Sequence, residues 1–199
     1  MTPSELLNLM ESSIIKTGFL RNTTVYGRAE LVALSPDQQF KGVNDKGAAV
    51  PVYNLKQTAN AMAGFKSYIC DYTPDKVHYQ ILDQEADYCF TVTMNGCTFG
   101  IGSQADDGNV MVTHGNMNSS GLGEEYGEAV DSLMGSGTSY ITPHMYARKS
   151  ADETRKNLTT FGIRINGTWN FFYQKYEILG PGQIKHLGLF PFKTNMLTG

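Results

Sequence analysis

The sequence predicts a single domain of the α+β class spanning residues 1–199. Its length of 199 residues is typical of one compact domain. Its 21 glycines and 11 tyrosines are typical of a chain rich in strands and turns. Several strand-like segments are interrupted by a few helical ones, without the regular alternation that builds a parallel α/β sheet. These three observations favour α+β over a helical bundle or an α/β fold.

A helix is predicted at the N-terminus. Thr2 is a suitable N-cap, Pro3 suits the first helical position, and Glu5 completes a capping box. Apolar residues then recur at helical spacing, and Gly18 is the predicted end of the helix. The residues of this apolar stripe are Leu6, Leu7, Met10, Ile14 and Ile15.

Extended segments dominate the rest of the chain. Strands are predicted within residues 19–34, 50–53, 66–72 and 77–82, and short helices over residues 124–133 and from Ser150 onward. A late hairpin over residues 161–173 turns at Asn166-Gly167, a pair that favours a type I′ turn.

The most informative segment is a second predicted hairpin. A strand over residues 90–94 is broken at Asn95-Gly96, resumes over 97–101, turns at 106–109 and returns over 110–114. Because side chains alternate along a strand, Cys97 and His114 are expected on the same face. Cross-strand neighbours of this kind have Cβ atoms about 5–8 Å apart. The hairpin therefore predicts that the thiol and the imidazole are neighbours at the rim of the core.

A thiol beside an imidazole is a chemically useful pair. The thiolate is a nucleophile, and a nearby imidazolium lowers its pKa. A tight turn at Asn95 and Gly96 exposes the sulfur and aims backbone amides at an oxyanion. Thr91, Thr93 or a backbone carbonyl is expected to orient the imidazole. The hairpin alone favours a non-catalytic interpretation, in which Cys97 is a small core residue and His114 a satisfied polar residue.

Composition excludes several other classes of function. A net charge of −3 and a pI near 5.8 do not suit a nucleic-acid-binding surface. No apolar run is long enough to span a bilayer, and no classical signal peptide is visible. Three cysteines without a CxxC or Cys/His spacing indicate free thiols and no zinc site. No metal or organic cofactor is expected.

The motif in residues 90–97, Phe-Thr-Val-Thr-Met-Asn-Gly-Cys, resembles the nucleophile segment of a family of bacterial glutamine deamidases. This family comprises the Burkholderia lethal factor and the catalytic domains of the cytotoxic necrotizing factors. Its members have Ser-Gly-Cys where this chain has Asn95-Gly96-Cys97, and a histidine follows across a hairpin, as His114 does here. A functional threonine of the lethal factor corresponds to Thr91. Weaker similarities at residues 15–18 and 173–176 extend the resemblance over most of the chain.

The resemblance implies a β-sandwich of mixed sheets flanked by helices, and hydrolysis of a glutamine side-chain amide in a host protein. It implies Cys97, His114 and Thr91 as catalytic residues, with Asn95 and Gly96 at the oxyanion. The expected substrate is a translation-initiation RNA helicase in preference to a Rho-type GTPase. We expect a monomeric, secreted bacterial effector that acts in the host cytoplasm, without direct nucleic-acid or membrane binding. The alternatives are a transglutaminase or thiol peptidase using the same pair, or a non-catalytic protein-binding module.

Overall fold

The computed structural model describes residues 1–17, 26–34, 40–116, 130, 132–135, 138–146 and 155–192. Its helices are α1 (Pro3–Ser12) and α3 (Pro143–Tyr146). Its strands are β1 (Ile14–Thr17), β2 (Tyr26–Ala33), β3 (Lys41–Val43), β4 (Ala49–Val50), β5 (Val52–Thr58), β6 (Phe65–Cys70), β7 (Lys76–Leu82), β8 (Tyr88–Thr91), β9 (Thr98–Gln104), β10 (Val110–Asn116), β11 (Ser139–Ile141), β12 (Arg155–Ile165), β13 (Thr168–Gly180) and β14 (Gln183–Pro191).

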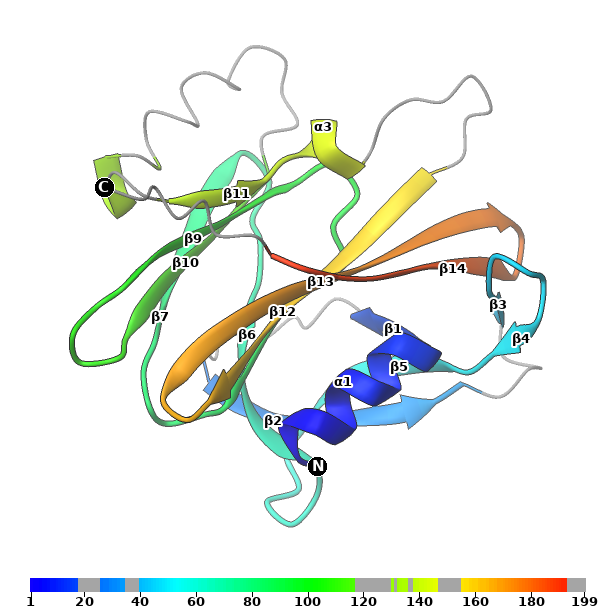
Figure 1. The fold of residues 1–199 in the computed structure, drawn as a ribbon, viewed down its shortest axis with the longest axis horizontal. Coiled ribbons are helices and arrows are strands. Elements are labelled where there is room, and N and C mark those ends of the chain that lie inside the picture. The colour runs from blue at the N-terminus through cyan, green and yellow to red at the C-terminus, as the bar shows by residue number, and fades with distance from the viewer. Residues whose placement is uncertain are drawn as a thin grey trace.

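The strands form two sheets (Figure 1). The larger has ten strands in the order β1-β5-β2-β6-β8-β12-β13-β14-β3-β4 and mixes parallel with antiparallel pairs. The smaller has the order β11-β9-β10-β7, and its pairs are antiparallel. The α+β sandwich flanked by helices is therefore confirmed for the described residues.

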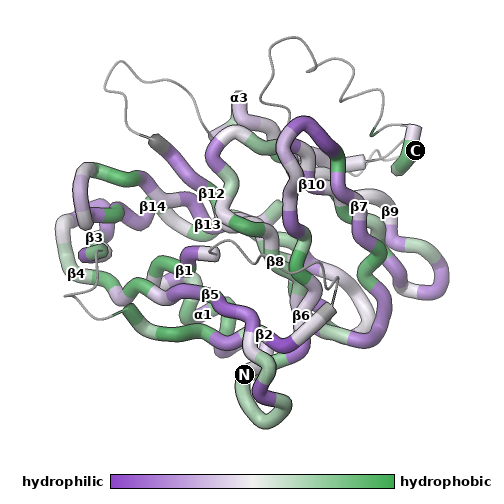
Figure 2. The backbone as a smooth tube through the Cα atoms, turned by 180° about the vertical axis from the view of Figure 1, so that it is seen from behind, coloured by the Kyte–Doolittle hydropathy of each residue, from purple (hydrophilic) through white to green (hydrophobic). Residues whose placement is uncertain are grey.

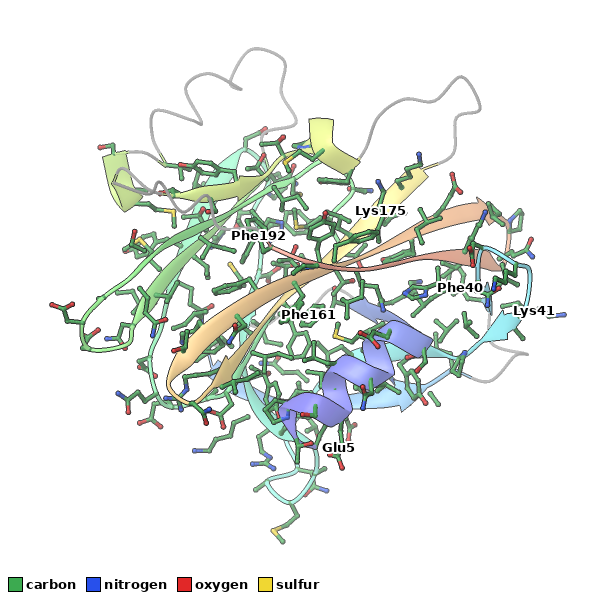
Figure 3. All side chains as sticks on the ribbon, viewed as in Figure 1. Glu5, Phe40, Lys41, Phe161, Lys175 and Phe192 are labelled. Carbon is green, nitrogen blue, oxygen red and sulfur yellow. The ribbon has the colours of Figure 1, made fainter. Side chains whose placement is uncertain are left out.

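The two sheets enclose one hydrophobic core. Apolar side chains from β6, β8, β12 and β13 of the large sheet meet those of β7, β9, β10 and β11 of the small sheet. At the end of β14, Phe192 packs against this cluster, as Figure 3 shows. Seen from behind, the tip of the β9–β10 hairpin is hydrophilic, whereas the apolar stretches lie further inside (Figure 2). The sandwich interior is therefore the place where the predicted site residues are buried.

Helix α1 covers the other face of the large sheet. It buries Leu6 and Met10 against Phe90 and Phe161, and Figure 3 shows Phe161 on the strand beside the helix. The predicted capping box is confirmed, since Thr2 and Glu5 bond each other's backbone amides reciprocally. The helix and the inter-sheet core thus occupy opposite faces of the same strands.

The predicted end of α1 at Gly18 is wrong, because the helix ends at Ser12 and β1 begins at Ile14. The cause lies far along the chain, in the buried amide of Gln174 on β13. Its Nε2 donates to the carbonyls of Met10 and Ser13 at 2.6 and 2.7 Å, and its Oε1 accepts from the Ile15 amide at 2.7 Å. One side chain thereby satisfies carbonyls at the helix end and the amide that opens the strand.

Both predicted hairpins are confirmed. Asn166 and Gly167 have φ of 51° and 81° at the β12–β13 turn, as a type I′ turn requires. The β9–β10 hairpin turns at residues 105–109, with Gly108 at φ 84°. The predicted strands within 66–72 and 77–82 correspond to β6 and β7. Predictions on residues 19–25, 124–129 and 147–154 lie outside the described residues. The helix predicted from Ser150 onward does not extend beyond that gap, because Arg155–Ile165 forms β12.

Candidate active site

Cys97 lies in the short segment that leads from the large sheet into the small one. After β8 the chain makes a single bridge to β12 at Met94, turns at Asn95-Gly96 and enters β9 at Thr98. Gly96 has a φ of 153°, which side-chain-bearing residues rarely adopt. The Cys97 side chain is only 5% exposed and belongs to the core cluster between the sheets. The predicted turn before the cysteine is present, but it directs the sulfur inward.

His114 lies on β10, on the neighbouring strand of the hairpin. It is paired with Phe99, and Gly115 is paired with Thr98. Cys97 precedes Phe99 by two residues, so Cys97 and His114 are diagonal neighbours, and such pairs have Cβ atoms about 7–8 Å apart or slightly less. Both face the sandwich interior, where His114 is fully buried. The hairpin therefore brings the two predicted residues together, although His114 lies inside the core and not at its rim.

A backbone carbonyl orients the imidazole. His114 Nδ1 lies 3.2 Å from the carbonyl oxygen of Cys70, at the end of β6. This bond requires a proton on Nδ1 and leaves the lone pair on Nε2, the form that accepts a proton. Within the part of the chain that the structure describes, Nε2 has no hydrogen-bond partner, so it is not bonded to Cys97 Sγ. The imidazole is therefore held at one nitrogen and unoccupied at the other.

Burial makes the resting pair neutral. It raises the pKa of the Cys97 thiol to about 11, against a smaller opposing effect of the Asn95 backbone amide. It also lowers the pKa of His114 to about 4, opposed by the hydrogen bond to the Cys70 carbonyl. The expected thiolate–imidazolium pair is therefore not the state of this buried site at neutral pH. A neutral imidazole beside a thiol is instead suited to general-base catalysis.

Tyr146 of α3 forms hydrogen bonds with the turn that contains Cys97. Its hydroxyl accepts a hydrogen bond from the Gly96 amide at 3.0 Å and donates one to the Cys97 carbonyl at 2.6 Å. The ring is 1% exposed. Gly96 was expected to contribute to an oxyanion hole, but here its amide is occupied by the tyrosine hydroxyl. The Asn95 amide is directed at the Cys97 sulfur, where it lowers the pKa of the thiol.

Thr91 does not contact the imidazole through its hydroxyl. That oxygen accepts from the Thr160 amide at 3.1 Å and donates to the Thr160 carbonyl at 3.3 Å, which ties β8 to β12. The alternative, Thr93, donates to the Thr17 carbonyl at 3.0 Å and bonds the Tyr176 hydroxyl at 3.0 Å. Of the three expected orienting groups, the structure supplies the backbone carbonyl, and it comes from Cys70.

A pocket of about 290 Å³ lies beside this pair. Tyr72 joins the two, because it lines the pocket and its ring centroid lies 5.8 Å from that of His114. The thiol of Cys97 is close enough to raise the pKa of the Tyr72 hydroxyl, although burial has the larger effect. The other described lining residues are Lys16, Thr17, Val92, Thr93, Asn157, Tyr176 and Ile178.

Three contributors to the site were not predicted as such: the Cys70 carbonyl, Tyr72 and Tyr146. Each lies far from Cys97 or His114 in sequence, and neither a carbonyl nor an isolated tyrosine leaves a local pattern. The side chain of Cys70 itself lies in the core. Among the described residues, no group of three or more His, Cys, Asp or Glu side chains is placed to hold a metal ion. No described helix has the length and apolar character needed to cross a membrane.

Comparison with known proteins gives a structural likeness only. No protein-family model matches the sequence, and no curated protein matches it. The fold is similar to the crystal structure of the C-terminal domain of CNFy from Yersinia pseudotuberculosis, with a TM-score of 0.44 and 8% identity. The similarity covers 96% of this chain and 99% of that one. At this identity and TM-score, the likeness does not assign the chain to a family.

Proposed function

We propose that the chain is a cysteine-dependent glutamine deamidase in which Cys97 is the nucleophile and His114 the general base and acid. One observation carries the proposal. His114 is a diagonal neighbour of Cys97, its Nδ1 is engaged by the Cys70 carbonyl, and its buried Nε2 has no partner in the described residues. A nucleophile, a base and a group that orients the base are the parts that thiol catalysis requires. The motif in residues 90–97 supplies the reaction class.

In the proposed reaction, His114 Nε2 takes the thiol proton as Cys97 Sγ attacks the glutamine carboxamide carbon. The tetrahedral intermediate then collapses, and the imidazolium gives its proton to the leaving nitrogen, which departs as ammonia. A thioester remains. His114 then removes a proton from water, the resulting hydroxide attacks the thioester carbon, and the thiol and a glutamate side chain are released. Amide and water are consumed, and carboxylate and ammonium are formed, because the departing ammonia takes up the proton that the new carboxyl group loses.

The oxyanion of this intermediate needs donors from the turn at residues 95–97. The Gly96 amide becomes available only when it exchanges the Tyr146 hydroxyl for the substrate oxygen. The Cys97 amide is the second candidate. Because the thiol is only 5% exposed, substrate entry requires that the groups packed around it separate. In free enzymes, hydrogen bonds between catalytic groups are often long or unformed, and they tighten when substrate binds.

The proposed substrate is a glutamine of a host protein, with a translation-initiation RNA helicase favoured over a Rho-type GTPase. The proposed setting is that of a secreted bacterial effector that works in the host cytoplasm. Both proposals rest on the resemblance of residues 90–97 to the lethal-factor and necrotizing-factor deamidases. Thr91 contributes to the proposed site by fixing β8 through Thr160.

The test compares host-cell proteins after exposure to the wild-type chain and to a Cys97→Ser variant, by mass spectrometry of peptides. Deamidation increases the mass of one glutamine by about one dalton, and the hydroxyl of serine is a far weaker nucleophile. The wild type should produce a Gln-to-Glu change that the Cys97→Ser variant does not. A Cys89→Ser variant, in the same core, is the matched control and should retain activity. Full activity of Cys97→Ser would falsify the proposal.

Burial of both groups favours a second candidate, a non-catalytic protein-binding module in which Cys97 and His114 are core residues. It predicts no mass change in any target. The same experiment also separates two enzymatic rivals, because a transglutaminase would add an amine to the glutamine and a thiol peptidase would cut the chain.

A further inference from the structure

The pocket beside Cys97 and His114 has one basic residue, Lys16, among its described lining residues. Lys16, at the end of β1, is one of its lining residues, and no carboxylate is among the described ones. The ammonium nitrogen of Lys16 lies 3.6 Å from the centroid of the Phe40 ring, and Figure 3 shows that ring beside β3. A cation above an aromatic face is held in place without being neutralised.

Lys16 is half-buried and has no acidic partner among the described residues. Lys16 takes no part in the ion pairs Met1–Glu5 and Arg164–Asp87. Burial lowers the pKa of its ammonium, which means that the charged form has lost part of its hydration. An anion placed beside it would recover that free energy and would favour the charged form.

The remaining polar groups of the pocket are arranged by bonds within the wall. Thr93 Oγ1 lies 3.3 Å from Thr17 Oγ1 and 3.0 Å from the Tyr176 hydroxyl, so the three hydroxyls form a connected row. Thr17 and Tyr176 are buried. The Thr93 hydroxyl also donates to the Thr17 carbonyl at 3.0 Å, which holds the row in place. Lys16 therefore lies in a polar wall that has no carboxylate among its described residues.

We propose that this pocket is a subsite for the carboxylate of an aspartate or glutamate next to the target glutamine, bound by Lys16. The inference rests on the proposed deamidase function and specifies its substrate as an acidic segment. The pocket volume of about 290 Å³ accommodates one such side chain. Tyr72 lines the pocket and its ring centroid lies 5.8 Å from that of His114, so the subsite would lie near the reacting glutamine.

The test measures binding of short fluorescent peptides to a Cys97→Ala variant, which cannot turn them over. The peptides share a central glutamine in an alanine background, with glutamate, glutamine or lysine at the flanking positions. The glutamate peptides should bind about tenfold more tightly than the glutamine peptides, as expected for a charge-assisted hydrogen bond, and the lysine peptides most weakly. Adding Lys16→Met should abolish this preference, and Lys16→Arg should retain it.

The matched control is Lys41→Met, which removes the same charge from an exposed neighbour of Phe40 whose side chain points away from the molecule (Figure 3). It should keep the preference. The subsite proposal is wrong if the Lys16→Met variant still binds the glutamate peptides more tightly. It is also wrong if all peptides bind equally well, or if no peptide binds.

Ammonia release from the same peptides by the wild-type chain tests the reaction separately. Selective binding of acidic peptides without ammonia release would support the subsite and contradict the deamidase proposal. Ammonia release without a preference for acidic peptides would support the deamidase proposal and contradict the subsite.

Discussion

His114 donates its Nδ1 proton to the carbonyl of Cys70, so a strand of the small sheet is joined to the end of a strand in the large one. The bond lies in the sandwich interior, where His114 is fully buried. It fixes the tautomer of the imidazole as well as its position. Packing of the two sheets and the proton-accepting state of His114 are therefore linked, and five predictions follow from this arrangement and its surroundings.

Protein stability should depend on pH through His114. Its pKa is lowered by burial from 6.5 to about 4 in the folded state, so between these values the unfolded chain binds a proton that the folded chain does not. The free energy of unfolding should fall by about 3 kcal/mol as pH decreases through this window. Urea unfolding at several pH values should show a larger loss in the wild type than in His114→Gln, which keeps only the smaller effects of other groups such as His186, whose pKa burial also lowers. Equal losses in both proteins would contradict the prediction.

Alkylation of Cys97 should be slow and should accelerate with pH. With its pKa raised to about 11, the rate with iodoacetamide should increase roughly tenfold for each pH unit between 7 and 10. Cys70 and Cys89 should react later, because both are more deeply buried and burial raises their pKa values further. Site-resolved mass spectrometry measures all three rates. A plateau below pH 8.5 would instead indicate a thiolate–imidazolium pair, and equal slow labelling of all three would favour the binding module.

A Tyr146→Phe variant should lose activity by misplacing the nucleophile. The change removes the acceptor of the Gly96 amide and the donor to the Cys97 carbonyl. We expect a destabilisation of about 1–3 kcal/mol and a larger decrease in kcat than change in KM. A Tyr88→Phe variant, which loses a tyrosine hydroxyl bond to the Met1 carbonyl, is the control and should affect stability alone. A Tyr146→Phe variant with unchanged kcat would show that the turn at residues 95–97 keeps its conformation without the tyrosine hydroxyl.

A Thr91→Val variant should be destabilised and yet active. The isosteric change leaves the Thr160 amide without its acceptor and should cost about 1–3 kcal/mol. If Thr91 acts only by fixing β8, activity per folded molecule should stay within a few fold of the wild type, and Thr91→Ser should restore stability. A loss of kcat in both variants, with stability preserved in Thr91→Ser, would instead indicate a direct catalytic part for the hydroxyl.

A Gln174→Met variant should be among the least stable single variants of the chain. It leaves two carbonyls and one amide at the junction of α1 and β1 without their partner. Buried backbone groups of this kind cost about 1–3 kcal/mol each, so we expect a loss of several kcal/mol in urea unfolding. Gln104→Met, which removes an exposed side chain from a hairpin, should cost far less.

A structural feature could be predicted from the sequence when the residues that determine it lie close together in the chain. The hairpins were predictable because Asn166-Gly167 and residues 106–109 determine their own turns. The end of α1 was not, because Gln174 acts on it from 164 residues away. Apolar spacing through Ile14 and Ile15 continued the helical pattern, and a side chain from β13 interrupted it.

The same division holds for the candidate site. Cys97 and His114 share one hairpin, so their neighbourhood follows from strand alternation, and the motif around Cys97 marks it in the sequence. The Cys70 carbonyl and Tyr146 reach them across 44 and 49 residues. The depth of burial, and with it the neutral state of the pair, depends on how the two sheets pack, which no segment of the hairpin encodes.

The Nε2 of His114, which has no partner among the described residues, also has a consequence for stability. A polar nitrogen that is buried without a partner costs free energy, whereas a leucine or methionine of similar size would gain some by packing. A substitution such as His114→Leu should therefore stabilise the fold if the apolar side chain fits the space. The proposed deamidase would lose its general base in that variant, so stability and activity should change in opposite directions.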